Sequence, residues 1–349
     1  MVTQALLPSG CMTPDQRERY SRQIRFQGIG DAGQEALLRA TVAVVGCGAL
    51  GSFQAGAMAR AGVGRLLLID RDYLEVSNLQ RQWLYEEADV EAALPKAISA
   101  ADHVRAINSG CTAEAHVVDL TPSNIEDLLD GCDAILDGCD NFETRYLIND
   151  YAGYRGVPWV YGAAVGSYGI VMPVIPQQTA CLACMYPQPP GGAQPTCETA
   201  GVVNTVTSIV ASLQCAEVTK ILVGTAPSKR ITTFDVWSGV IRQLDQPPAD
   251  PECRVCAKRQ FDYLRGHNRA PISLCGRNAV QIHERARPLD LQALRQQLEP
   301  IATVRANEFA LRFFPSPYEM TIFPDGRAII KGTSDIGIAR SLYAQYVGA

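Results

Sequence analysis

Residues 41–70 read TVAVVGCGALGSFQAGAMARAGVGRLLLID, and this stretch decides the fold. An apolar strand runs into a glycine turn at 46–51, a small-residue helix pattern continues through residue 61, and a second apolar strand at 65–69 ends on an acid. Glycines let the backbone approach phosphate, the helix N-terminus attracts the anion, and the acid accepts hydrogen bonds from ribose hydroxyls. This order of elements therefore predicts nucleotide binding by Gly46, Gly48, Ala49, Gly51 and Asp70.

A second group of polar residues follows Asp70 at short spacings. Its members are Asp72, Ser77, Asn78, Arg81, Gln82 and Lys96. A dehydrogenase needs few cations at this place, because it does no chemistry on the phosphates. Amide, guanidinium and ammonium groups beside a ribose-binding acid indicate a triphosphate ligand. They would also stabilise the negative charge that develops during nucleotidyl transfer. Three other interpretations stay open on spacing alone: a solvated polar face, an oxidoreductase that binds NAD or FAD, and a nucleotide-binding scaffold without catalysis.

The composition describes a globular chain with room for a sizeable core. Of its 349 residues, 47% are hydrophobic and 19% are charged, and the formal net charge of −5 argues against a general nucleic-acid binder. Residues 1–12 lack the pattern of a signal peptide, and the longest apolar stretch, 202–223, carries polar residues and predicts a buried helix rather than a membrane span. Twelve cysteines in a chain of this length fit reduced thiols, so we expect a cytoplasmic protein.

Helix and strand patterns alternate along much of the chain. Residues 13–40 predict an N-terminal helical arm. The order predicted from residue 96 is helix, strand, helix and strand, at 96–107, 115–118, 121 onward and 132–137. Such alternation is typical of an α/β fold with a Rossmann-like, doubly wound, mainly parallel sheet covered on both faces. Residues 231–237 and 240–244 then predict a hairpin.

The strand at 132–137 runs into a short loop that carries Asp140 and Asn141. Ligands of parallel α/β sheets bind beyond the carboxyl ends of the strands, so both residues are predicted to face the nucleotide cleft. The alternative for Asp140 is a cap of the following helix, predicted over 142–152. Asp137 is the better candidate for a purely structural carboxylate.

Cysteines form the second constellation. Cys181 and Cys184 make one CxxC pair, and Cys253 and Cys256 make another. Each pair brings two thiolates close enough to bind one metal ion, and two pairs complete a tetrahedral site. The gap between the pairs is longer than in a zinc ribbon, so disulfides, free thiols and a redox CxxC stay open on spacing alone.

A loop rich in proline and glycine, 187–203, lies between the two CxxC pairs and carries Cys197. A thiol close to a helix N-terminus is more nucleophilic than usual. Cys197 is therefore a candidate nucleophile, and an inert loop thiol is the alternative.

Residues 265–349 predict a small α+β unit of strand, helix, two strands, turn, strand and helix. It contains 11 Lys or Arg and 7 Asp or Glu, hence a charge of +4, which leaves −9 for the rest of the chain. We therefore divide the chain into a nucleotide-binding domain at 13–262 and a C-terminal domain at 265–349. A module that recruits a partner protein and a plain appendage that supports a dimer are equally open for the second.

Three motifs together resemble one known family. RYSRQ at 19–23, GCGALG at 46–51, and Asp70 followed by SNLQRQ at 77–82 stand in the order and spacing of the ThiF/MoeB/HesA proteins, bacterial relatives of the ubiquitin-activating enzymes. The resemblance runs from about Tyr20 to Cys256. It implies an adenylyltransferase that uses ATP and Mg²⁺ to activate the C-terminal carboxylate of a small ubiquitin-like sulfur-carrier protein ending in Gly-Gly, of the thiamine or molybdopterin type. Adenylation of a peptide or another acid is the alternative.

The resemblance also implies partners and roles for single residues. A homodimer and a sulfur donor protein are the implied partners. In the family, Asp70 binds the ribose, Asp140 serves the magnesium ion or its water shell, and the paired CxxC motifs hold a structural zinc ion. Cys197 matches a cysteine that is the conjugating or persulfide cysteine in some branches and dispensable in others, so the resemblance makes it a candidate for thioester, acyl-disulfide or sulfur-relay chemistry. The region of the predicted hairpin helps to form the platform for the carrier. The residues that offset phosphate charge are Asn78, Arg81, Lys96 and Arg22 of the partner subunit.

Overall fold

A computed structural model of the chain describes residues 12–190, 197–267, 273–274, 279–282, 289–324, 326–333 and 335–348. Within these ranges the chain forms two compact units. The first comprises the described residues up to 190 together with 202–267, and the second comprises 197–201 with the described residues beyond 267. Each unit has its own sheet, with two hydrophobic cores in the first unit and one in the second.

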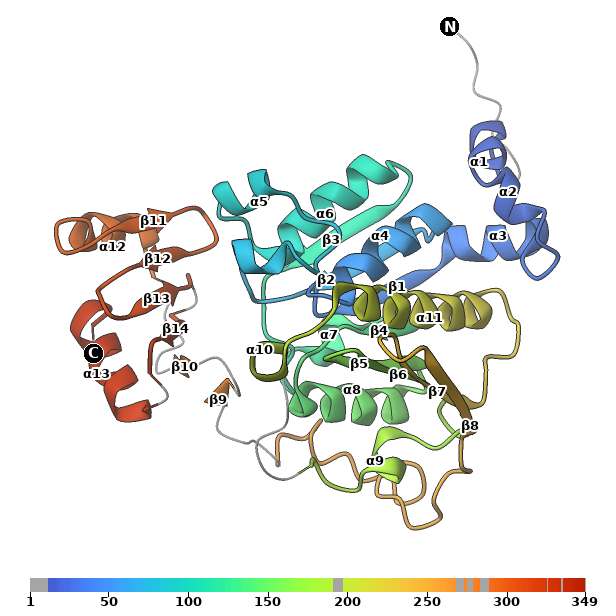
Figure 1. The fold of residues 1–349 in the computed structure, drawn as a ribbon. Helices are drawn as coiled ribbons and strands as arrows, with labels where there is room; N and C mark the ends of the chain where they lie inside the picture. Colours follow the sequence, from blue (N-terminus) through green and yellow to red (C-terminus); the bar gives the residue numbers. More distant parts are fainter. Residues whose placement is uncertain are drawn as a thin grey trace, which may run out of the picture. The chain divides into compact units, whose positions relative to one another are not determined.

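An eight-stranded mixed sheet forms the centre of the first unit (Figure 1). In spatial order its strands are β3 (Thr112–His116), β2 (Arg65–Ile69), β1 (Thr41–Val45), β4 (Ala134–Asp137), β5 (Trp159–Val165), β6 (Tyr168–Val174), β7 (Arg230–Asp235) and β8 (Val240–Asp245). The strands from β3 to β5 pair in parallel, whereas β6, β7 and β8 join antiparallel. The sheet therefore contains the predicted parallel half and the predicted hairpin at one edge.

Helices cover both faces of this sheet (Figure 1). One face is covered by α3 (Gly30–Arg39), α4 (Gly51–Ala61), α6 (Lys96–Ile107) and α11 (Asn204–Leu222). The other is covered by α7 (Ile125–Leu128), α8 (Phe142–Arg155) and α9 (Leu182–Met185). Val42 and Val44 of β1 lie in the first core, while Ala43 and Val45 lie in the second, because successive strand side chains point to opposite faces. The doubly wound arrangement is confirmed.

The predicted N-terminal arm consists of α1 (Pro14–Arg19), α2 (Ser21–Ile24) and α3. Thr13 caps α1 with its side chain. Gln23 of α2 donates a hydrogen bond from Nε2 to the carbonyl oxygen of Ala61 at 2.8 Å. This bond ties the arm to the C-terminal end of α4.

Three boundaries in the first unit differ from those predicted. β3 lies earlier than the predicted 115–118, because residue-by-residue pairing with β2 sets its bounds rather than its own apolarity. α7 begins after the predicted start at residue 121, since the Asn124 side chain accepts a hydrogen bond from the Thr121 N–H and forms a turn there. α8 runs past residue 152 and ends at Gly156, whose φ of 78° terminates the helix in the left-handed conformation.

α11 is the buried helix predicted from the longest apolar stretch. It contacts β4, β5, β6 and α4, so one helix braces the middle of the sheet. Within the described ranges, no helix combines the length and the apolar character needed to cross a bilayer.

The second unit is built on a six-stranded antiparallel sheet. In spatial order its strands are β11 (Val304–Ala306), β12 (Leu311–Phe313), β13 (Glu319–Ile322), β14 (Ala328–Lys331), β10 (Ala279–Ile282) and β9 (Ser273–Leu274). Residues of α12 (Leu291–Leu298) and α13 (Ile336–Tyr346) complete the core on one face. β9 and β11 are absent from the predicted pattern, because strands of two and three residues are too short to show periodicity.

Candidate functional site

The carboxyl ends of β1 and β4 meet at the switch point of the sheet, where ligands of open α/β sheets bind. Gly46 directly follows β1, and Gly138 directly follows β4. A Cβ atom added to Gly46, whose φ is 86°, would lie 2.5 Å from the carbonyl oxygen of Gly138. A Cβ atom on Gly51 would lie 1.8 Å from the carbonyl oxygen of Gly46. The strand ends approach this closely only because these residues have no side chains.

Asp70 braces the glycine turn from the end of β2. Its Oδ2 accepts a hydrogen bond from the Cys47 N–H at 2.7 Å, and its Oδ1 accepts one from the Asp72 N–H at 2.7 Å. Burial raises the pKa of the Asp70 carboxyl, and the Lys96 ammonium opposes that rise. A carboxylate has about four lone-pair sites, so these two bonds leave acceptor capacity for a ligand hydroxyl.

Lys96 lies beside the same turn, at the first residue of α6. Its Nζ is 3.2 Å from Asp72 Oδ2, and its backbone N–H donates to the Asp72 carbonyl at 2.8 Å. The buried Tyr85 hydroxyl donates to the carbonyl oxygen of Cys47 at 2.7 Å and lies 3.2 Å from that of Lys96. Tyr85 was missed by sequence reasoning, since one tyrosine between polar motifs carries no periodic signal. The structure thus brings Asp70, Asp72 and Lys96 together.

Residues 77–82 lie on η1 (Val76–Asn78) and the turn that follows it. Asn78 is buried, and its Oδ1 accepts a hydrogen bond from the Glu75 N–H at 3.1 Å. Arg81 Nη1 donates to the carbonyl oxygen of the exposed Ser77 at 2.9 Å. The Asn78 amide therefore shapes the turn that presents Arg81.

Gln82 turns a buried amide toward the glycine turn. Its side chain is 3% exposed, and its Oε1 has no hydrogen-bond partner among the residues that the structure describes. A Cβ atom added to Gly48 would lie 3.9 Å from Gln82 Nε2. An unfilled buried acceptor at this place fits a site that takes up a ligand. The next helix, α5 (Glu87–Glu91), leads the chain on toward α6.

The loop after β4 carries two aspartates in different environments. Asp137, the last residue of β4, is fully buried, and its Oδ2 lies 3.0 Å from Arg145 Nε. Asp140 is exposed, and its Oδ1 accepts a hydrogen bond from Asn141 Nδ2 at 3.2 Å. Asn141 caps α8, because its Oδ1 accepts a hydrogen bond from the Thr144 N–H at 2.8 Å. The cap is therefore Asn141, and the Asp140 carboxylate lies at the surface next to the switch point.

Arg22 is not brought together with the glycine turn of its own chain. It is exposed on α2, whose neighbouring Gln23 is fixed to Ala61 at the far end of α4. The glycine turn lies at the opposite, N-terminal end of α4. A helix of 11 residues is roughly 16 Å long, so about that length separates the two places.

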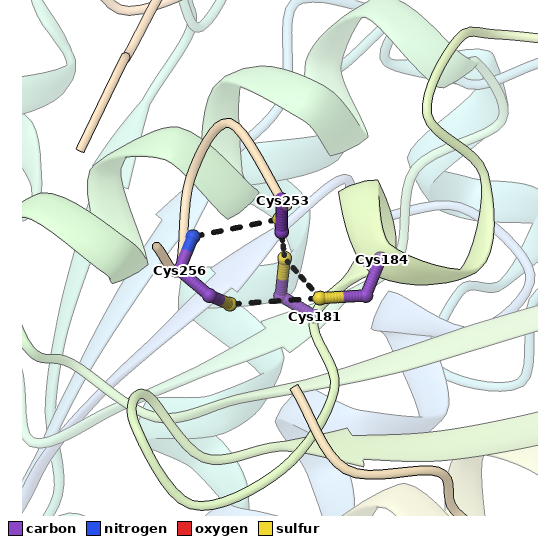
Figure 2. Close-up of side chains that lie close together, drawn as sticks. All are labelled: Cys181, Cys184, Cys253 and Cys256. Carbon is purple, nitrogen blue, oxygen red and sulfur yellow. Dashed lines mark hydrogen bonds between the residues drawn. The ribbon is translucent and has the colours of Figure 1, made fainter. Parts of the chain in front are cut away.

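The two CxxC pairs converge on one point, as Figure 2 shows. The Sγ atoms of Cys181 and Cys184, of Cys181 and Cys253, and of Cys184 and Cys256 are each 3.7 Å apart, and all four lie within 4.8 Å of one another. Zinc binds thiolate sulfur at about 2.3 Å, and tetrahedral geometry then separates the sulfurs by about 3.8 Å. A disulfide would need about 2 Å. The four thiols therefore fit a zinc ion.

Neighbouring groups orient this cysteine cluster. Asn149 of α8 donates from Nδ2 to Cys181 Sγ at 3.6 Å, and its Oδ1 accepts a hydrogen bond from the Leu182 N–H at 2.9 Å. The Asp250 N–H donates to Cys184 Sγ at 3.4 Å. Hydrogen bonding among the thiols lowers the pKa of Cys184 and raises that of Cys181, so the four thiols act as one group. Asn149 was missed by sequence reasoning, because nothing marks it inside a helix.

The second CxxC pair is docked on α8 by an ion pair. Arg254, which lies between the two cysteines of that pair, places its Nη2 at 2.8 Å from Oδ1 of the buried Asp150. Its guanidinium lies 5.1 Å from the ring centroid of Tyr263. The backbone of Cys197 opens the four-residue α10 (Cys197–Ala200), while the Cys197 side chain lies outside the described part of the chain.

Comparison with known proteins agrees with this geometry. The ThiF family model matches residues 20–255. The chain is 40% identical over 335 residues to the sulfur carrier protein ThiS adenylyltransferase of Bacillus subtilis. The alignment covers 95% of this chain and 99% of the relative. It is 38% identical over 252 residues to the sulfur carrier protein adenylyltransferase of Thermus thermophilus. That alignment covers 70% of this chain and 92% of the relative.

Among solved structures, E. coli MccB with MccA-N7isoASN has the same fold. The TM-score is 0.62 at 21% identity, over 72% of this chain and 77% of that chain. The family match and the two relatives together show that the chain belongs to the ThiF family.

Proposed function

We propose that this chain is an ATP-dependent adenylyltransferase that activates the C-terminal glycine carboxylate of a small ubiquitin-like sulfur-carrier protein. The observation that carries the proposal is the alignment with the ThiS adenylyltransferase of Bacillus subtilis over 95% of this chain and 99% of the relative. The polar cluster at the switch point supplies matching chemistry. Both named relatives are adenylyltransferases, which favours this reaction over the redox chemistry that a glycine turn alone permits.

The nucleotide binds across the ends of β1, β2 and β4. The backbone of the 46–51 turn and the N-terminus of α4 take the phosphates. Asp70 uses its remaining lone pairs for the ribose hydroxyls. The unfilled Oε1 of Gln82 is a further acceptor for a donor group of the nucleotide.

In the reaction, a carboxylate oxygen of the terminal glycine attacks the α-phosphorus of ATP. The bond from that phosphorus to the oxygen of the leaving pyrophosphate breaks, and an acyl-adenylate forms. Lys96 and Arg81 offset the negative charge that spreads over the phosphate oxygens. Asp72, 3.2 Å from Lys96 Nζ, holds the ammonium next to the turn before the nucleotide arrives.

A bound magnesium ion would supply positive charge that neutralises part of the charge of the phosphates. Asp140 and Asn141 would hold it or its water shell, because exposed carboxylate and amide oxygens are the ligands that magnesium prefers. The cysteine cluster would hold a zinc ion with no open coordination position, and that ion would link the second CxxC pair to the first.

A homodimer would complete the site. Arg22 is exposed at the far end of α4 from its own glycine turn, which suits a role in the neighbouring site. Arg22 of the partner subunit would then add a third cation to the phosphates. We place the reaction in the cytoplasm, where free thiols such as the described cysteines stay reduced.

The β7–β8 hairpin offers the carrier a docking surface. β8 is the edge strand of the sheet, and every residue of it is exposed. Trp237, Ile241 and Leu244 are 83%, 72% and 58% exposed. Exposed large apolar side chains on a sheet edge are typical of protein-binding surfaces. Cys197 stays a candidate for a later covalent step with the carrier or a sulfur donor.

The test is ATP–pyrophosphate exchange with candidate carriers that end in Gly-Gly. We expect exchange that depends on one carrier and disappears when its terminal glycine is removed. A matched carrier with an amidated C-terminus is the control, because it keeps the docking surface and lacks the attacking carboxylate. Absence of exchange with every carrier, in folded and metal-loaded protein, would contradict the proposal.

A further inference from the structure

The loop between β4 and α8 holds Asp140 by fixing the residue on each side of it. On one side, the Cys139 N–H donates to Asp137 Oδ1 at 2.9 Å, and the Cys139 carbonyl oxygen accepts a hydrogen bond from Arg145 Nη2 at 2.7 Å. On the other side, Asn141 is fixed as the cap of α8. The exposed Asp140 therefore extends from a backbone that is held before and after it.

Arg145 joins three parts of the fold at this point. Besides the bond to Cys139, its Nη2 donates to the carbonyl oxygen of Gly162 on β5 at 2.9 Å, and its Nε donates to Asp137 Oδ2 at 3.0 Å. The residue is 6% exposed, and its guanidinium lies 4.9 Å from the ring centroid of Tyr161. A planar guanidinium can reach these acceptors at once, whereas the single ammonium of lysine cannot.

The same strand end is also held from the opposite face of the sheet. Gln54 of α4 and Gln214 of α11 both donate to the carbonyl oxygen of Asp137, at 3.2 and 2.9 Å. The two amides bond to each other at 2.7 Å. Hydrogen bonds from both faces therefore converge on the residue from which the loop starts.

Stability alone gives a weak reason for this arrangement. Removing two charges from water costs about as much as their attraction returns, and apolar replacements of buried ion pairs are often neutral or stabilising. The Asp137–Arg145 pair also holds the N–H and the carbonyl oxygen of Cys139. That arrangement has a clearer use, because it defines where the next side chain, Asp140, lies.

We infer that Arg145 is a positioning residue for Asp140, acting through the Cys139 backbone. The inference rests on the proposed function for the role of Asp140, and it adds a residue that touches neither nucleotide nor carrier. Losing the bonds to Cys139 and Gly162 frees the loop, so that Asp140 meets its ligand in the right place for only a fraction of the time.

The test compares Arg145→Lys with wild type in the full-length, metal-loaded protein. We expect the exchange rate to fall about 30-fold, the equivalent of two hydrogen bonds, and half-saturation by Mg²⁺ to need several times more of the ion. Hydrogen–deuterium exchange of the amides at 138–141 should speed up. The matched control is Arg155→Lys, an exposed arginine in the last turn of the same α8, which should change none of the three.

A second variant keeps the test decisive if lysine is not tolerated in the core. Asp137→Asn with Arg145→Gln removes both buried charges, and we expect it to fold and to show the same loss. Normal exchange rate and Mg²⁺ dependence in either folded variant would overturn the inference, and so would failure of both variants to fold. Wild type without carrier-dependent exchange would overturn the proposed function instead, and amide exchange would still report on the loop.

Discussion

The open site at the switch point and the cysteine cluster are built in opposite ways, although α8 contributes to both. At the open site, polar groups range from the buried Asn78 and Lys96 to the exposed Asp140, and the buried acceptor Gln82 Oε1 has no partner among the described residues. In the cluster, four thiols face one another and receive further hydrogen bonds from Asn149 and the Asp250 N–H. The first presents polar groups that suit a ligand which binds and leaves, whereas the second has the geometry of a site that would enclose one metal ion.

This difference predicts whether a substitution in each region lowers mainly stability or mainly activity. A closed metal site contributes to folding, because its ligands come from distant parts of the chain. An open site contributes to transition-state binding, and an exposed group there can be removed without unfolding the protein. The predictions below test this contrast in order of expected size.

The largest effect is expected for Cys253→Ser. The cluster should lose its metal, and the free energy of unfolding should fall by on the order of 5 kcal/mol, because the second CxxC pair is no longer held to the first. Metal analysis and thermal unfolding measure both. Cys132→Ala, at a buried thiol outside the cluster, is the control and should keep the metal. Full metal content in Cys253→Ser would show that the four thiols do not act as one site.

Asp140→Asn should show the opposite pattern. We expect carrier-dependent exchange to fall by about 10²- to 10³-fold, because under the proposed function the lost charge is one that would hold the metal–nucleotide complex. The free energy of unfolding should change by less than about 0.5 kcal/mol, since the side chain is exposed. Asp130→Asn, an exposed aspartate at the C-terminal side of α7, is the matched control for exchange. A large loss of stability in Asp140→Asn would remove the contrast between the two regions.

Gly46→Ala separates close approach from backbone strain. Alanine at Gly131, where φ is 72° and nothing lies within 4 Å, should cost about 1–2 kcal/mol from the left-handed conformation alone. Alanine at Gly46 carries the same strain and also meets the Gly138 carbonyl oxygen at 2.5 Å, so it should cost about 2 kcal/mol more. Urea unfolding of both variants gives the difference. Equal costs would mean that the strand ends can move apart freely.

The smallest effect is expected at an ion pair outside both regions. A hydrogen bond from Arg65 lowers the pKa of the Glu114 carboxyl, and both side chains are more than a third exposed. Because the folded pKa is depressed, the pair stabilises the protein above the unfolded pKa of about 4.3 and loses that contribution as the pH falls through the folded pKa. Glu114→Gln should therefore cost about 0.5 kcal/mol or less at pH 7, and nothing in strong acid.

Unfolding of wild type and Glu114→Gln at a series of pH values measures that difference. A cost that stays constant down to acid pH would assign the interaction to something other than the charge pair. A cost above about 1 kcal/mol would place this surface pair in the same range as the site residues, contrary to the usual weakness of exposed ion pairs.

Much of the first unit could be predicted because its signals are local. Glycine at 46 and 51 meets a steric requirement that no other residue satisfies, and apolar strands beside small-residue helices have only a few stable arrangements. The CxxC pairs were visible as spacing, although spacing left disulfides and free thiols open. The short strands β9 and β11 were missed, because two or three residues acquire strand geometry only from their neighbours.

The sequence by itself therefore determined the nucleotide-binding order of elements, the acid at the end of β2 and the identity of the four thiols, because each depends on residues close in the chain. Only the tertiary structure decided that Arg145 donates to the Gly162 carbonyl oxygen on β5, and that Gln214 of α11 donates to the carbonyl oxygen of Asp137. It alone brought four sulfurs within 4.8 Å of one another across the chain. Contacts between distant residues are set by how helices and strands pack, and no local pattern encodes them.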